Sequence, residues 1–117
     1  MSSRERGAAA ESLVLRLLLG RGWCLLDRNW SCRWGELDLV LVKQHRLLVV
    51  EVKGRRSPAR ALQSVLAAKR RRLGRAISCW RALHPIQSSC LLQVAVAVVP
   101  LPPSNGPVRW ILLDRLC

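Results

Sequence analysis

The sequence predicts a single α/β domain over residues 1–117, with a mixed central sheet flanked by helices in the order α-β-β-β-α-β-β. A length of 117 residues suits one domain and leaves no room for two. Half of the residues are apolar, which is enough for a hydrophobic core. Helical and strand-like hydrophobic periods alternate along the chain, and this pattern is typical of helices packed on a sheet.

Hydrophobic periodicity places the individual elements. Apolar side chains that recur every three or four residues predict two helices, and β-branched or aliphatic runs bounded by polar, Gly or Pro residues predict five strands. The predicted helices span residues 4–19 and about 58–83, and the predicted strands span residues 23–30, 36–42, 47–53, 91–99 and 108–113.

The helix ends are marked by local sequence. The first predicted helix stops at Gly20 and Gly22. The second begins where Ser57 can serve as N-cap and Pro58 takes the first helical position. These signals agree with the periodicity of the apolar residues.

The loop Lys43-Gln44-His45-Arg46 sets the register of the predicted hairpin. An even-numbered loop here places opposite each other the residues whose numbers sum to 89. Asp38 then faces Glu51, and Lys53 lies two residues further along the same face. A loop with an odd number of residues would instead place the two acids on opposite faces.

Acidic residues are scarce, with 7 Asp and Glu against 20 Lys and Arg, yet Glu36, Asp38 and Glu51 all fall in this hairpin. Facing carboxylates repel unless a cation lies between them. We therefore expect Asp38 and Glu51 to hold Mg²⁺ or Mn²⁺, with the Val52 carbonyl within reach of the ion. The alternative is an ordinary hairpin with a Glu36–Lys53 surface ion pair, which leaves the Asp38–Glu51 pair unexplained.

Two charged residues interrupt the apolar stripes of the predicted helices. Glu11 lies in the stripe of the first helix and Lys69 in that of the second, so both are expected to turn inward. The alternative is that each lies at the edge of its stripe and extends into water.

A formal net charge of +13 and a pI near 11.5 predict a polyanionic partner, with nucleic acid the first candidate. An anionic membrane surface is the second candidate. No run approaches the ~20 apolar residues that span a bilayer, and the first residues do not resemble a signal peptide. We expect a soluble cytoplasmic protein. The expected nucleic-acid contacts are Arg55, Arg56, Arg70, Arg71 and Arg72, with Trp34 stacking on an unpaired base.

Asp38 followed by Glu51-Val52-Lys53 on adjacent strands, after a helix that carries Glu11, resembles the PD-(D/E)XK nuclease superfamily. More narrowly, the chain resembles the YraN-like family of small bacterial proteins, predicted to be endonucleases related to archaeal Holliday-junction resolvases. The matching motifs are Arg6-Gly7, Ala10-Glu11, Gly22-Trp23, Arg28-Asn29-Trp30, Gly35-Glu36-Leu37-Asp38-Leu39-Val40, Val49-Val50-Glu51-Val52-Lys53, Arg55 and Lys69-Arg70-Arg71-Arg72-Leu73.

The resemblance implies a restriction-endonuclease-like fold and a metal-dependent endonuclease that hydrolyses phosphodiester bonds by metal-activated water. It implies that Glu11, Asp38 and Glu51 are metal ligands or closely support the ligands, that Lys53 is the catalytic lysine, and that Lys69 is an accessory contact to phosphate or water. DNA, branched or single-stranded, is expected ahead of RNA. Enzymes of this fold that cut junctions often act as dimers, and the apolar run 91–101 offers an interface for a homodimer.

One position departs from the family pattern. Relatives usually carry an acid in the fourth predicted strand, where this chain has Gln93. The alternative function is therefore a non-catalytic, basic nucleic-acid-binding protein whose nuclease site has decayed.

Overall fold

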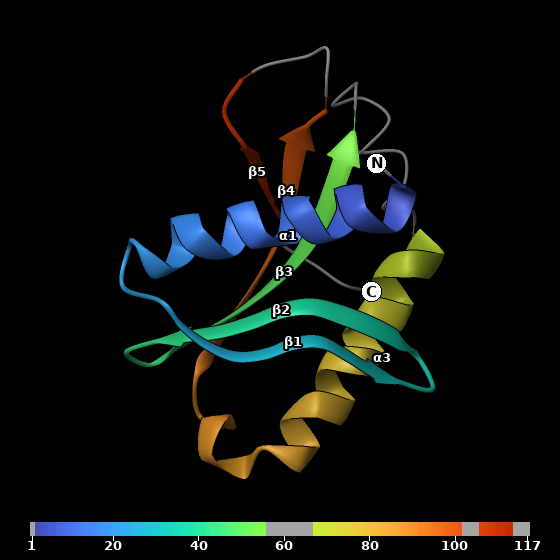
Figure 1. Ribbon diagram of the computed structural model, residues 1–117. Coiled ribbons are helices and arrows are strands. Elements are labelled where there is room, and N and C mark those ends of the chain that lie inside the picture. The colour runs from blue at the N-terminus through green and yellow to red at the C-terminus, as the bar shows by residue number, and fades with distance from the viewer. Residues whose placement is uncertain (1, 56–66, 102–105, 114–117) are drawn as a thin grey trace.

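The computed structural model describes residues 2–55, 67–101 and 106–113, and these residues form a mixed sheet with helices on its two faces (Figure 1). The order of elements predicted from the sequence is confirmed. The predicted start of the second helix, at Ser57 and Pro58, lies outside the described residues. The elements are α1 (Ser3–Leu19), β1 (Cys24–Cys32), β2 (Gly35–Lys43), β3 (Arg46–Arg55), α3 (Ala67–Leu83), the short 3-10 helix η1 (Pro85–Gln87), β4 (Leu91–Pro100) and β5 (Arg109–Leu112).

The five strands of the described sheet lie side by side in sequence order, β1-β2-β3-β4-β5. β1, β2 and β3 form an antiparallel meander. β3 and β4 run parallel, and α3 lies in the connection between them, because parallel neighbours need a long crossover. β5 returns antiparallel to β4. The sheet is therefore mixed, as predicted.

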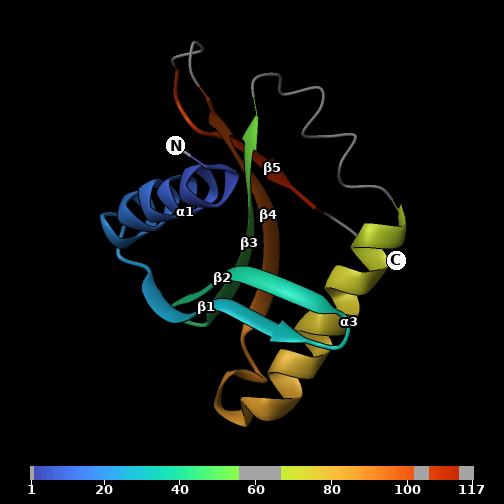
Figure 2. The same ribbon diagram turned by 45° about the vertical axis from the view of Figure 1, so that its right-hand side comes forward.

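Helix α1 covers one face of the sheet (Figure 2). The helix starts at a side-chain cap, since Ser2 Oγ accepts a 3.2 Å hydrogen bond from the Glu5 N–H. Ala10, Val14 and Leu18 are buried against strand residues that include Leu39, Leu41, Leu48 and Val50. The apolar stripe expected from the sequence thus fixes the orientation of α1.

Helix α3 packs on the opposite face of the sheet (Figure 2). Ala76, Ile77 and Trp80 are buried against a cluster that includes Val49. The Trp80 Nε1–H donates a 2.8 Å hydrogen bond to Asp27 Oδ2, which satisfies the indole N–H inside the core. This bond connects α3 to β1. Of the strands that α3 contacts, β1 is the farthest from it in the sequence.

The apolar run 91–101 does not provide an exposed interface, so that expectation was wrong. This run forms β4, whose two edges pair with β3 and β5. Residues 94–99 are buried in the sheet. A homodimer would have to use another surface.

None of the helices among the described residues is long and apolar enough to cross a membrane.

Candidate active site

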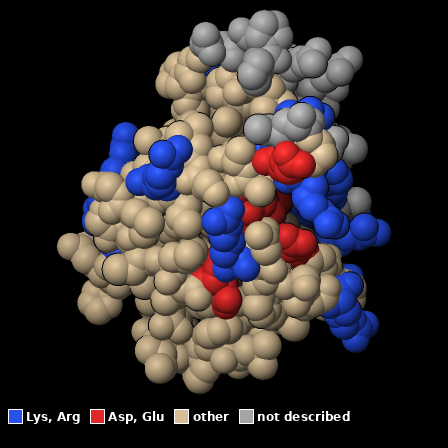
Figure 3. Space-filling view, in the orientation of Figure 1, with Lys and Arg blue, Asp and Glu red and all other residues tan. Residues whose placement is uncertain are grey.

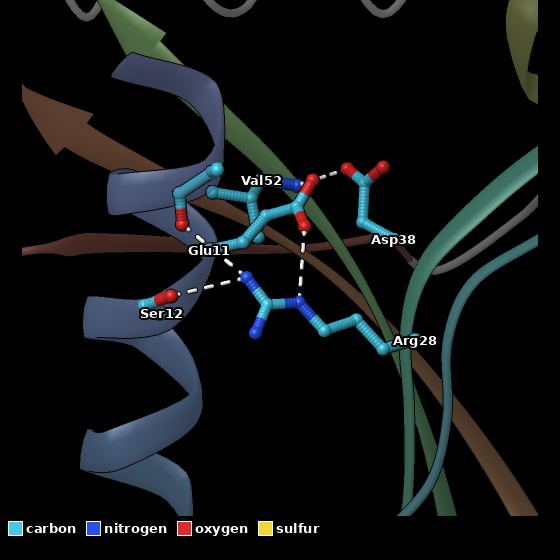
Figure 4. A network of polar contacts seen from close by, with 6 residues as sticks. Glu11, Ser12, Arg28, Asp38 and Val52 are labelled. Atoms are coloured by element: carbon cyan, nitrogen blue, oxygen red, sulfur yellow. Dashed lines mark hydrogen bonds and ion pairs between the residues drawn. The ribbon is translucent and has the colours of Figure 1, made fainter. Parts of the chain in front are cut away.

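Strands β2 and β3 part at Asp38. The pairs from Lys43–Arg46 to Leu39–Val50 all sum to 89, so the predicted register is confirmed over the paired part of the hairpin. Pairing ends at Leu39–Val50, one residue before Asp38 and Glu51 would face each other as ladder partners. Asp38 Oδ2 instead accepts a 2.8 Å hydrogen bond from the Val52 backbone N–H (Figure 4). The carboxylate thus replaces a backbone partner where the strands separate.

A left-handed residue lies opposite this point on β1. Asn29 has φ of 53° and lies across from Asp38, between the pairs Arg28–Leu39 and Trp30–Leu37. Leu37 packs in the core under α3 whereas Leu39 packs in the core under α1, although strand alternation would place both on one face. The change of face therefore centres on Asp38.

Glu51 projects into a cavity of about 240 Å³ between the sheet and α3. Its Oε1 atom is buried and has no hydrogen-bond partner among the residues that the structure describes. Lys53 lines the same cavity, two residues further along β3, while Asp38 is not among the lining residues. The remaining lining residues are Trp34, Gly35, Glu36, Lys69, Arg72, Leu73 and Ala76.

Burial raises the pKa of both carboxyl groups. For Glu51 the main cause is desolvation, followed by the Asp38 charge. The Lys53 charge and a hydrogen bond from the Asp38 backbone oppose these effects, and the pKa of Glu51 rises to about 8. For Asp38 desolvation is again the largest cause. The Val52 hydrogen bond opposes it, the Glu11 charge adds to it, and the pKa of Asp38 rises to about 6.

The pair of carboxyl groups fits a hard divalent cation. Mg²⁺ takes oxygen ligands, commonly from one or two carboxylates, and completes its shell with water and substrate phosphate. A buried carboxylate oxygen without a partner, such as Glu51 Oε1, is costly unless a cation or donor reaches it. Asp38 and Glu51 are therefore the residues of this chain that would hold the ion.

Glu11 turns inward as predicted, with 15% of its side chain exposed, but it is bound to Arg28. The Arg28 Nε lies 3.4 Å from Glu11 Oε1, and its guanidinium also donates to Ser12 Oγ at 3.1 Å and to the Ala8 carbonyl at 3.3 Å (Figure 4). These contacts join α1 to β1. The negative charge of the Glu11 carboxylate is thereby neutralised by the Arg28 guanidinium.

Within residues 2–55, 67–101 and 106–113, no three His, Cys, Asp or Glu side chains gather closely enough to hold a metal ion. The described residues therefore do not bring Glu11 together with Asp38 and Glu51 in one cluster. Glu11 still acts on the site, because its charge raises the pKa of Asp38. Its partner Arg28 is aligned with Leu39 in the strand register, and Leu39 packs under α1, so Arg28 faces α1 as well.

Lys69 lines the cavity from α3 and its side chain is exposed, which matches the alternative that it lies at the edge of its apolar stripe. A lysine can place its stem along a protein surface and its ammonium in water, which explains a position at the mouth of a cavity. The alternative surface ion pair between Glu36 and Lys53 is not formed. Ion pairs between described residues join Arg28 to Glu11 and His84 to Asp27.

Trp34 is half-buried and already carries two guanidinium groups, those of Arg33 and Arg75, each 4.6 Å from the ring centroid. A base could stack on a covered face only by displacing one of them. The indole also packs against the core under α3. Trp34 therefore lines the cavity with two guanidinium groups against its ring, and its faces are not free for a base to stack on.

The predicted basic contacts lie along α3 and at the end of β3. Arg71 and Arg72 are exposed, and Arg70 is half-buried with an Nε atom that is buried and without a partner. Arg55 is the last residue of β3, and Arg56 lies outside the described residues. In Figure 3, acidic atoms lie in the middle of the face, and Lys and Arg atoms gather beside them on the side where α3 runs in Figure 1.

Gln93 lies away from the cavity. It pairs with Leu48 on β3, three positions before Glu51, or roughly 10 Å along the strand. It lines a different hollow, beside Leu18 of α1 and Trp110 of β5. The missing acid at this position therefore does not remove a group from the Glu51–Lys53 cavity.

Comparison with known proteins gives a consistent result. The model of the uncharacterised protein family UPF0102 matches residues 10–99, which include all the carboxylates described above. A UPF0102 protein of Parasynechococcus marenigrum (strain WH8102) is 69% identical over 117 residues, which cover 100% of this chain and 87% of the relative. A second, from Synechococcus sp. (strain CC9902), is 54% identical and covers 95% of this chain and 94% of the relative. A more distant one, from Stutzerimonas stutzeri (strain A1501), is 36% identical and covers 93% of this chain and 92% of the relative.

Proposed function

The chain belongs to the uncharacterised protein family UPF0102, the YraN-like family expected from the sequence, and we propose that this member is a Mg²⁺- or Mn²⁺-dependent endonuclease that hydrolyses phosphodiester bonds in DNA. We further propose that its fold is that of the PD-(D/E)XK superfamily. The single observation that carries the proposal is Glu51, a half-buried residue beside Asp38 and Lys53 whose Oε1 atom is buried without a hydrogen-bond partner among the described residues.

Asp38 and four residues that line the cavity each have a chemical role in this proposal. Asp38 and Glu51 would hold the cation, which when bound supplies Lewis-acid stabilisation of charge on the phosphate. Lys53 would orient the attacking water through its ammonium group and offset negative charge that develops on the phosphate oxygens. Lys69 and Arg72, from the α3 side of the cavity, would hold the other phosphate oxygens. Hydrolysis forms a bond between the water oxygen and phosphorus and breaks the bond between phosphorus and one ester oxygen. The water gives up a proton, and the released ester oxygen takes up a proton.

The test is cleavage of labelled single-stranded and branched DNA by purified protein with Mg²⁺ or Mn²⁺. Asp38→Asn and Glu51→Gln should each lower the rate at least ~100-fold, a loss in keeping with removal of a group that stabilises charge in the transition state. Glu5→Gln is the matched control, because Glu5 is exposed on α1 away from the cavity. Unchanged cleavage by Asp38→Asn would refute the proposed roles.

The second candidate is a nucleic-acid-binding protein without catalysis, and the exposed arginines of α3 favour it because they need no intact metal site. It predicts salt-sensitive binding to DNA, no cleavage, and no effect of Mg²⁺ on thermal stability. Gln93, the residue that first suggested a decayed site, does not support it, because Gln93 lies outside the cavity.

A further inference from the structure

A second hollow lies along α3 next to the Glu51–Lys53 cavity. We call it the α3 groove. Its volume is about 720 Å³, and its walls include Trp34, Arg71, Gly74, Arg75, Ile77 and Leu92. Trp34 lines both the groove and the cavity, so the two spaces are neighbours separated by one side chain.

The two spaces differ in what they can contain. Pockets for whole small molecules usually measure about 300–1,000 Å³. The cavity, at about 240 Å³, is below that range and suits a phosphate group with an ion. The groove, at about 720 Å³, has room for a nucleoside. By size, the phosphate fits the cavity and the base fits the groove, on the two sides of Trp34.

The lining of the groove matches a nucleotide chemically. Ile77 is buried and Leu92 is half-buried, which gives the groove an apolar floor, and Gly74 adds no side chain above it. Glycine is less favourable than alanine inside a helix, so Gly74 lowers the helix propensity of α3 at the point where α3 lines the groove. The guanidinium groups of Arg71 and Arg75 are exposed at the rim, where backbone phosphates would lie.

One cation of the groove is already engaged and is not assigned to the ligand. Arg81 donates to the Ser88 carbonyl at 2.6 Å and to the Cys90 carbonyl at 3.4 Å. Arg71 and Arg75 are therefore the phosphate-binding candidates. Arg75 also lies over the Trp34 ring, which connects the groove to the wall of the cavity.

We propose that the α3 groove binds an unpaired nucleotide adjacent to the phosphate that occupies the cavity. The proposal rests on the proposed nuclease function and specifies its substrate class: DNA with a single-stranded segment at the cleavage point. A base within continuous duplex is paired and stacked, so it cannot place its face on an apolar floor. An unpaired base is free to lay its face against the apolar floor while its backbone phosphates reach Arg71 and Arg75.

The first test is binding of a fluorescent single strand and of a duplex of equal length, measured without divalent ions. Wild type should prefer the single strand, and the double variant Arg71→Ala, Arg75→Ala should lose about tenfold or more of that affinity. The double variant Arg4→Ala, Arg16→Ala is the charge-matched control, because both residues are exposed on α1, on the other face of the sheet. Equal losses for single strand and duplex in the double variant would overturn the proposal.

The second test fills the groove without changing charge. Gly74→Leu places a side chain over the floor and improves helix propensity, so the variant should remain folded. Single-strand affinity should fall at least ~5-fold while the melting temperature stays the same or rises, a loss that corresponds to one stacked base. Unchanged single-strand affinity in this variant would exclude the groove as the site of the base.

A third test uses thiols that the chain already carries. Cys79 is half-buried in the wall of the groove, and Cys24 is exposed at the start of β1. A bound single strand should slow alkylation of Cys79 while Cys24 reacts at its usual rate, as read by mass spectrometry of peptides. Equal alkylation of Cys79 with and without the strand would contradict the proposal.

Failure of this inference can be told apart from failure of the proposed function. Glu51→Gln should keep single-strand binding and lose cleavage. If wild type cuts DNA with Mg²⁺ but the groove variants keep their strand preference, the groove proposal is wrong and the nuclease stands. If the groove variants lose strand binding but wild type never cuts, the nuclease is wrong and the groove stands.

Discussion

At the scale of single residues, Glu51 is the group whose environment departs most from that of an ordinary side chain. The sequence places it among aliphatic residues of a strand, and the fold leaves the residue half-buried but buries its Oε1 atom without a hydrogen-bond partner among the described residues. A buried carboxyl group of this kind is stable mainly in its protonated form unless a cation is present. Its protonation should therefore be visible in the stability of the protein.

Without divalent ions, the free energy of unfolding should fall as pH rises from about 5 to 8. The pKa values of Asp38 and Glu51 rise from 3.8 and 4.5 to about 6 and about 8 on folding, so the folded chain binds more protons than the unfolded chain in this range. The stability due to these protons is complete below the unfolded values and is lost as pH passes the folded ones. Urea denaturation in EDTA across this range measures the effect.

Glu51→Gln provides the control for that titration. The amide cannot ionise, so the variant should lose most of the pH dependence and should be about 2–4 kcal/mol more stable than wild type near pH 8 without metal. A variant that follows the wild-type curve would show that the titrating group lies elsewhere.

Addition of Mg²⁺ should raise the melting temperature more at pH 8 than at pH 5.5. The cation requires ionised carboxylates, and these are available only at the higher pH. At about 100 times the dissociation constant, binding adds about 2.7 kcal/mol to the free energy of unfolding. Differential scanning calorimetry of wild type and Asp38→Asn measures this, and equal shifts in the two proteins would exclude Asp38 as a ligand.

At the scale of elements, the site exists because β2 separates from β3 while β1 continues to follow β2. Asn29, in the left-handed conformation, lies opposite Asp38 where this happens. Asparagine tolerates positive φ better than other residues except glycine. We therefore infer that Asn29, on the neighbouring strand β1, permits β2 to change the face on which its side chains lie.

Asn29→Val should destabilise the protein by about 1–3 kcal/mol, because a β-branched residue at φ of 53° is strained. Asn29→Gly is the control and should be nearly neutral, since glycine adopts this conformation freely. Thermal denaturation compares the two. Equal destabilisation by both changes would mean that the Asn side chain, and not the backbone angle, is what matters.

At the scale of the whole molecule, the formal net charge of +13 governs association with polyanions. Binding to DNA should weaken steeply with salt, with log K falling linearly against log salt concentration at a slope of about −0.9 per phosphate neutralised. Arg71→Ala should make the slope less negative by about one unit, and Arg16→Ala should leave it unchanged. Fluorescence anisotropy between about 50 and about 300 mM salt measures the slopes of both variants.

Much of this architecture could be read from the sequence because its signals are local. Periodicity identified α1 and the strands, and the even loop at Gln44 and His45 fixed the hairpin register that the structure confirms. The same local logic placed Glu11 inward but could not identify its partner Arg28, and it left the position of Lys69 undecided. Both depend on contacts with segments distant in the sequence.

The sequence by itself determined the order of elements, the hairpin register, and the concentration of scarce acids on two strands. Only the tertiary structure decided which acids share a site, because that depends on the separation of β2 from β3 at Asp38 and on the pairing of Glu11 with Arg28. It also placed Gln93 outside the cavity and Trp34 between two spaces. Backbone pairing and periodicity act over neighbouring residues, whereas charge neutralisation and cavity shape depend on side chains that meet only after the chain has folded.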